Sequence, residues 1–137
     1  LGFLQAPGTG SAEKRSKLDG IYQRFPRLAE RRKQMGTTLS GGEQQMLAIA
    51  RVLTGKPRLL LIDEPTEGLA PIIVQELVTL MQSLAREGQA ILLVEQNIHL
   101  ALKLSQRFYL MERGQIELAG ASSDEAAKSK LLHEVSV

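Results

Sequence analysis

The sequence predicts an α/β fold in which parallel strands are flanked by helices. Two continuously apolar runs, at residues 59–62 and Ala90–Val94, are typical of strands that a parallel sheet buries on both faces. Between them, apolar residues recur at helical spacing from Pro71 to about Arg86, which gives the order strand, helix, strand. A length of 137 residues with 43% hydrophobic content suits one globular domain or part of one.

The composition excludes several classes of protein. The absence of cysteine rules out a disulfide scaffold, a thiolate metal site and a cysteine nucleophile. The 17 Lys and Arg residues are nearly balanced by 15 Asp and Glu, and aromatic residues make up only 4%, so nucleic acid is not an expected partner. No apolar run approaches the roughly 18 residues that a membrane-spanning helix needs. Because Leu1 is not a methionine, we expect a processed chain or a piece of a longer one.

The amino-terminal third predicts a loop and then a charged helix. Proline and glycine residues indicate a loop or a cut end over residues 1–11. Apolar spacing predicts a helix over residues 12–32 that is interrupted at Pro26. Eight basic residues against three acidic ones between Glu13 and Lys33 indicate either a solvated helix face or a surface for a partner.

Turn and cap residues define the remaining elements. A helix over residues 40–53 is expected to end at Gly55, and the helix that starts at Pro71 is expected to end at Gly88. Ser122 and Glu125 have the spacing of a capping box for a last helix. The other elements are a short helix over Ile98–Leu104, strands over 108–111 and 115–119 on either side of Gly114, and the last helix to about His133.

The first segment that could form a functional site is Leu39-Ser40-Gly41-Gly42-Glu43-Gln44. It stands at the start of a helix, where free N–H groups and a partial positive charge suit a phosphate. A capping box made by Ser40 and Glu43 alone is the simpler alternative. Two adjacent glycines favour a functional loop, because they are costly at a helix start unless another group must approach closely.

The second such segment is the apolar strand that ends in Asp63-Glu64-Pro65. Ligands bind beyond the carboxyl ends of strands in parallel sheets, and adjacent side chains there point in different directions. One acid could therefore hold a magnesium ion through water, while the other faces a nucleophilic water. A strand that simply ends in polar turn residues is the alternative.

Taken together, the two segments resemble the ATP-binding-cassette (ABC) family. Residues 39–44 resemble its signature loop and residues 59–64 its Walker B strand, and the resemblance runs from about residue 13 to residue 121. Residues 39–48, 63–71 and 94–97 are similar to the ATPase subunit of bacterial importers for branched-chain amino acids. Importers for urea, amides or other amino acids have similar subunits.

The resemblance implies roles for single residues. Ser40, Gly41, Gly42 and Glu43 would contact ATP held by a partner subunit, because two ATPases of this family face each other head to tail. Asp63 would act on magnesium through water. Catalysis would fall to Glu64, which faces the attacking water, and to Gln96, which positions the γ-phosphate.

Three positions depart from the usual family pattern. Glu43 stands where a glutamine is usual, Gln96 where the switch histidine is expected, and Ala70 where the D-loop has an aspartate. A neutral amide at Gln96 cannot become a cation, which weakens any mechanism that needs a protonated histidine. The alanine removes an N-cap, and His99 lies three residues too late, on a helix, where we expect a surface residue.

The resemblance also implies an organisation and a cellular setting. Residues 1–137 would form a partial ABC ATPase domain, with a helical subdomain and signature helix over 12–55, a core part over 56–121 and a carboxyl-terminal helix over 122–137. ATP and Mg²⁺ would be the cofactors. The partners would be a second ABC ATPase subunit, identical or different, and transmembrane permease subunits, with no nucleic acid and no direct membrane insertion. The location would be peripheral, at the cytoplasmic face of the inner membrane.

The phosphate-cradling loop G-x-x-x-x-G-K-S/T does not occur in the 137 residues. The nearest segment, residues 8–14, has Glu13 where the second glycine is needed. We therefore expect the carboxyl-terminal part of an ATPase, which alone binds Mg-ATP weakly and hydrolyses none. We also expect the strands near Ile62 and Val94 to expose apolar faces and to promote self-association. A DNA-maintenance ATPase and a non-catalytic docking fragment remain as alternatives of another class.

Overall fold

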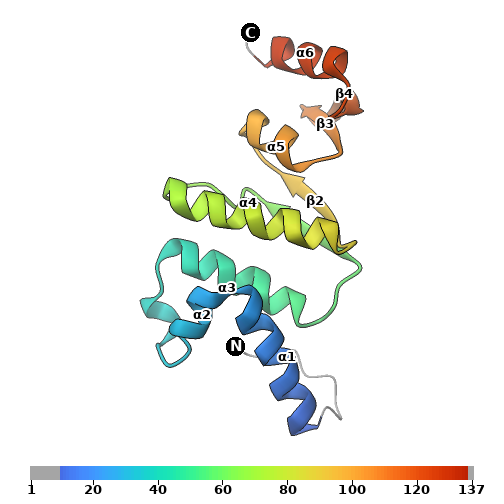
Figure 1. The fold of residues 1–137 in the computed structure, drawn as a ribbon. Coiled ribbons are helices and arrows are strands. Elements are labelled where there is room, and N and C mark those ends of the chain that lie inside the picture. The colour runs from blue at the N-terminus through green and yellow to red at the C-terminus, as the bar shows by residue number, and fades with distance from the viewer. Residues whose placement is uncertain (1–9, 136–137) are drawn as a thin grey trace. The chain divides into compact units, whose positions relative to one another are not determined.

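The computed structural model describes residues 10–135, and Figure 1 shows the order of its elements. These residues divide into two compact units. The first takes in Leu1–Leu60 as far as it is described and Thr66–Ala90, and the second takes in Leu61–Pro65 and Ile91–Val137 as far as it is described. Residues 1–9, where most of the amino-terminal loop was predicted, lie outside the described part, and Ser11 already belongs to a helix.

The first unit is built from helices. They are α1 (Ser11–Arg24), α2 (Pro26–Glu30), the short 3-10 helix η1 (Gly36–Thr38), α3 (Gly41–Leu53) and α4 (Pro71–Arg86). Pro26 interrupts the first helix as predicted, since it lacks an N–H and instead opens α2 at its first position. The apolar side chains that α1 to α4 bury are Ile21, Phe25, Leu28, Met46, Ile49, Ala50, Leu77, Val78, Met81 and Leu84.

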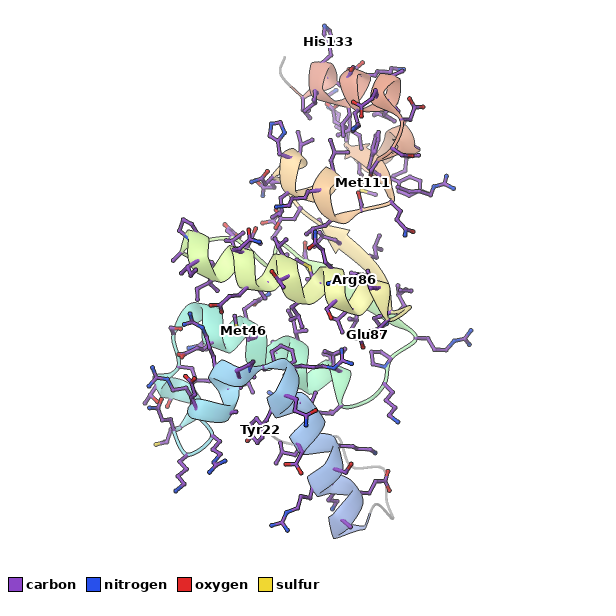
Figure 2. All side chains as sticks on the ribbon, viewed as in Figure 1. Tyr22, Met46, Arg86, Glu87, Met111 and His133 are labelled. Atoms are coloured by element: carbon purple, nitrogen blue, oxygen red, sulfur yellow. The ribbon has the colours of Figure 1, made fainter. Side chains whose placement is uncertain are left out.

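Two ion pairs join the first two helices to the α4 segment. The Arg24 guanidinium donates to Glu87, which lies at the carboxyl-terminal end of α4 (Figure 2). Arg27 donates from both Nε and Nη2 to Glu76 Oε1, at 3.0 and 2.6 Å. Part of the basic stretch is therefore engaged within the chain, where the sequence left a solvated face and a partner surface as its two interpretations.

The second unit contains two pairs of strands. Strand β1 (Leu59–Asp63), which begins in the first unit, is hydrogen-bonded to β2 (Ala90–Val94), and helix α4 lies between them in the chain as in a β-α-β unit. Helix α5 (Ile98–Leu104) leads to an antiparallel hairpin of β3 (Arg107–Glu112) and β4 (Gln115–Ala121). The predicted turn at Gly114 is confirmed, with positive φ at Arg113 and Gly114.

Two local predictions need correction. The last helix, α6 (Glu125–Glu134), is capped by Asp124, whose Oδ1 accepts from the N–H groups of Ala126 and Ala127, so the predicted capping box of Ser122 and Glu125 does not form. The Ser122 hydroxyl lies 2.9 Å from that of Ser105 instead. After α3, the residue with positive φ is Lys56 rather than Gly55.

The strands β1 and β2 are not buried on both faces within the described chain. Leu60 and Ile62 are buried. The residues that remain exposed to solvent are Leu59 (50%), Leu61 (72%), Leu92 (52%) and Val94 (51%). The expectation that these strands expose an apolar face is confirmed, and the expectation of burial on both faces is wrong for this chain. Among the described helices, none combines the length and the apolar character that crossing a bilayer requires.

Candidate functional site

The loop before α3 is held by reciprocal hydrogen bonds. Ser40 is the N-cap, and its Oγ accepts from the Glu43 N–H at 3.3 Å. In return the Ser40 N–H donates to Glu43 Oε2 at 2.8 Å, and the Gln44 side chain donates to the Leu39 carbonyl at 2.9 Å. The capping box proposed from the sequence therefore exists, and it fixes the loop at the amino-terminal end of the helix.

The two glycines of this loop differ in what surrounds them. A Cβ built on Gly42 would lie 2.4 Å from Cγ2 of Ile73 on α4, so packing inside the chain already requires a glycine there. A Cβ on Gly41 would meet only Leu69 Cδ2 at 3.8 Å, an ordinary contact, and Gly41 is exposed. The argument from close approach to a ligand therefore applies to Gly41 and is not needed for Gly42.

Glu43 is buried, and its carboxylate has partners on both oxygens. Arg31, the residue that follows α2, donates from Nε to Glu43 Oε1 at 3.2 Å, while Oε2 accepts from the Ser40 N–H. The hydrogen bond from the Ser40 backbone, followed by the Ser40 hydroxyl and the Arg31 guanidinium, lowers the pKa of Glu43, although burial opposes this. The ionised carboxylate is thus the form that the loop stabilises.

The acidic pair after β1 is placed by a special backbone geometry. Asp63 is the last residue of β1, and its side chain is exposed. Glu64 has a φ of 42°, in the left-handed region, and its N–H donates to the Val94 carbonyl at 2.9 Å, which continues the pairing of β1 with β2. Pro65, which follows, is fully buried. The left-handed residue turns the chain directly after the strand, where the sequence predicted the site.

Gln96 and Glu64 are in direct contact. Gln96 Nε2 donates to Glu64 Oε1 at 2.7 Å, over a separation of 32 residues. This bond uses one carboxylate oxygen, and Oε2 can accept from another donor, such as a water molecule. His99 lies on α5 with its side chain exposed, as predicted, and is not part of this pair.

The predicted residues thus form two groups, one in each compact unit. Residues 40–43 lie in the first unit, and Asp63, Glu64 and Gln96 lie in the second. In the part of the chain that the structure describes, no three acidic or histidine side chains gather as a metal cluster. One exposed carboxylate, that of Asp63, still fits Mg²⁺ because this ion takes one or two protein carboxylates and completes its shell with water and phosphate.

Two residues that contact the first group, Arg31 and Ile73, were missed by the reasoning from sequence. Arg31 was counted only as part of a basic stretch, and Ile73 only as part of the apolar face of α4. Arg31 contacts Glu43 across 12 positions, and Ile73 contacts Gly42 across 31 positions. A pattern of neighbouring residues cannot predict contacts over such separations in the sequence. Pro26 separates Arg24 from Arg27 and Arg31, so the spacing of these arginines gave no sign of a shared face.

Comparisons with known proteins identify the family. The sequence pattern of the ABC transporter family matches residues 5–67. The high-affinity branched-chain amino acid transport ATP-binding protein BraG of Pseudomonas aeruginosa is 54% identical over 100 residues, 73% of this chain and 43% of BraG. The glutamine transport ATP-binding protein GlnQ of Escherichia coli is 43% identical over 89 residues, 65% of this chain and 37% of GlnQ.

The structural comparison extends over nearly the whole chain. CbiO1 of Clostridium perfringens, described as part of the ABC transporter complex cbiONQ, has a TM-score of 0.79 at 26% sequence identity. The match covers 94% of this chain and 51% of CbiO1, so the predicted α/β cassette fold is confirmed. The chain spans about two-fifths of the length of the two curated relatives. A sequence match across the loop and the acidic strand end, joined to a shared fold, shows that the chain belongs to the ABC transporter ATP-binding proteins.

Proposed function

We propose that the chain is part of the ATP-binding and ATP-hydrolysing subunit of an ABC importer for branched-chain amino acids. The observation that carries the ATPase assignment is the contact between Glu64, directly after β1, and Gln96, which follows β2. A carboxylate at the end of such a strand, held by a neutral amide, is suited to accept a proton from an attacking water.

The two acids divide the chemistry between them. Asp63 would hold Mg²⁺ through water, and that ion, when bound, neutralises charge on the nucleotide phosphates. Glu64 would orient water and take its proton. Gln96 fixes one oxygen of Glu64, and its amide oxygen stays available to a water or to a protonated group. This arrangement works without a cationic imidazole, which accounts for glutamine at the switch position.

Residues 40–43 would act on nucleotide held by a second ATPase subunit. Ser40 presents a hydroxyl and Gly41 an exposed backbone at the positive end of α3, which suits an anionic phosphate. Gly42 would support this loop by packing against Ile73, and Glu43 by capping the Ser40 N–H. The subunit would work as a homo- or heterodimer bound to transmembrane permease subunits, at the cytoplasmic face of the inner membrane.

The cargo assignment rests on the relatives. The identity to the branched-chain amino acid protein BraG, 54%, exceeds the identity to the glutamine protein GlnQ, 43%. Importers for other amino acids, urea or amides are the second candidate, because GlnQ shows that amino acid importers with another cargo are also similar. Uptake of labelled leucine against labelled glutamine, in cells that carry the complete transporter, separates the two.

The substitution Glu64→Gln tests the ATPase assignment. In a complete subunit that contains this chain, it should lower ATP hydrolysis by about 10²- to 10⁴-fold, because an amide cannot take the proton from water. ATP binding should persist, and the ATP-bound dimer should accumulate. The control is Glu117→Gln, which removes an exposed carboxylate from β4. Normal turnover in Glu64→Gln would remove Glu64 from its role.

A further inference from the structure

Arg31 stands in an unusual position relative to the loop before α3. It follows α2 at the carboxyl-terminal cap, and its Nε reaches across 12 positions to Glu43 Oε1 at 3.2 Å. The other oxygen of Glu43 accepts from the Ser40 N–H at 2.8 Å. One carboxylate therefore links the end of α2 to the residue that starts the loop.

The chemistry of this link favours arginine over other cations. The Glu43 side chain is 11% exposed, whereas that of Arg31 is 49% exposed. The guanidinium therefore lies between the buried carboxylate and the solvent. A guanidinium presents donors in a fixed plane and remains charged at all relevant pH values. Lysine could supply the charge but not the fixed Nε–H that points at Oε1.

A groove lies along the same residues. It has a volume of about 720 Å³ and is lined by Arg31, Gln34, Met35, Thr38, Leu39, Ser40 and Glu43. The segment between α2 and α3, which includes η1, contributes residues to the lining of the same groove. The Arg31–Glu43 contact and the capping box bridge this open segment through side chains.

We propose that Arg31 is a positioning residue for Ser40 and Gly41: it holds Glu43 in the orientation that caps Ser40, and so sets the loop that would meet ATP. The inference rests on the proposed function for the role of the loop, but its geometric part concerns this chain alone. Arg31 itself does not touch nucleotide. The neighbouring Arg32, by contrast, is exposed and makes no side-chain hydrogen bond or ion pair among the described residues.

The experiment compares Arg31→Met with Arg31→Lys and the matched control Arg32→Met. Methionine keeps an apolar stem and removes the donors. Hydrogen exchange of the Ser40 amide in this chain, read by NMR, reports the cap directly. Because the Arg31 side chain is half exposed, Arg31→Met should raise that exchange rate by up to about fivefold. Arg31→Lys should give a smaller rise, and Arg32→Met none.

The same three variants are then placed in a complete subunit that contains this chain. For Arg31→Met, kcat for ATP hydrolysis should fall by up to about fivefold while KM for ATP stays within error, because the loop would act on nucleotide that another subunit holds. The melting temperature should fall by no more than about 4 °C, because the lost charge pair is worth at most about 1 kcal/mol. Arg31→Lys should recover part of kcat. A purely structural role would lower the melting temperature without separating kcat from KM, and the loss of activity would follow the loss of stability across the variants.

Two results would overturn the inference. One is equal Ser40 exchange in Arg31→Met and Arg32→Met, which breaks the geometric link. The other is increased exchange with unchanged kcat, which shows that the cap of Ser40 does not affect ATP hydrolysis. If the unsubstituted subunit hydrolyses no ATP, the proposed function fails, and a Ser40 exchange rate that is still raised only by the Arg31 variants would support the geometric link.

Discussion

Helices α3 and α4 begin in different ways although both lie in the first unit. The start of α3 has a serine N-cap, a reciprocal glutamate and an arginine that holds the glutamate. The start of α4 has Ala70 at the N-cap, with no side-chain hydrogen bond, followed by Pro71. Yet Gly42 of the first start packs against Ile73 of the second. The start of α3 is therefore fixed by side chains that cap it, and the start of α4 by Pro71 and by the packing of Ile73 on Gly42.

The largest effect is expected from Gly42→Ala. The added methyl would lie 2.4 Å from Ile73 Cγ2, on a β-branched side chain with little freedom, so α3 or α4 must shift. We expect a loss of about 1–3 kcal/mol in the free energy of unfolding, measured by chemical denaturation.

The matched control is Gly41→Ala, whose methyl would meet only an ordinary contact. It should change the free energy of unfolding by less than about 1 kcal/mol. Equal losses in the two variants would show that the contact with Ile73 does not distinguish the two glycines, and would weaken the comparison of the two helix starts.

A smaller, opposite effect is expected from Ala70→Asp. Ala70 already has the extended backbone of an N-cap, with φ −63° and ψ 146°, so an aspartate there can accept from free N–H groups of α4. The variant should raise the free energy of unfolding by about 0.5–2 kcal/mol. Ala85→Asp, near the other end of α4, should not stabilise, because an anion there opposes the helix dipole. No gain from Ala70→Asp would mean that α4 needs no cap.

The smallest effect is expected from Glu43→Gln. Glutamine can still complete a capping box, so the variant removes mainly the charge that pairs with Arg31, at a cost below about 1 kcal/mol near neutral pH. The pKa of Glu43 is lower in the folded chain than the ordinary 4.5. Its contribution is therefore present above that ordinary pKa and is lost as the pH falls through the lower, folded value.

Denaturation at several pH values measures this dependence. The difference in stability between the native chain and Glu43→Gln should shrink from neutral pH towards strongly acidic pH. A difference that is constant with pH would mean that the charge of Glu43 does not stabilise the start of α3.

Local signals predicted most of the elements and part of the site. The break at Pro26, the end of α4 near Gly88 with its φ of 87° and the turn at Gly114 each depend on one residue whose backbone preference decides the structure. The capping box at Ser40 and Glu43 also lies within four positions. These features were predicted correctly because each depends only on residues that are close together in the sequence.

The errors have a common physical origin. Ser122 and Glu125 had the spacing of a capping box. Asp124 is the N-cap of α6 instead, because its side chain accepts hydrogen bonds from two N–H groups. The apolar runs of β1 and β2 predicted burial on both faces of the sheet, but within the described chain one apolar face is left exposed. The hydrogen bond between Gln96 and Glu64 was not foreseen because it depends on the pairing of two strands.

The ion pairs of the basic stretch have a consequence for its long-range field. Residues 13–33 carry eight basic against three acidic residues, an excess of five, but Glu43, Glu76 and Glu87 pair with three of the arginines and reduce that excess to two. At physiological ionic strength, charges are screened beyond about 8 Å. A partner that approaches this surface would therefore feel little attraction at a distance, and its association rate should depend only weakly on salt.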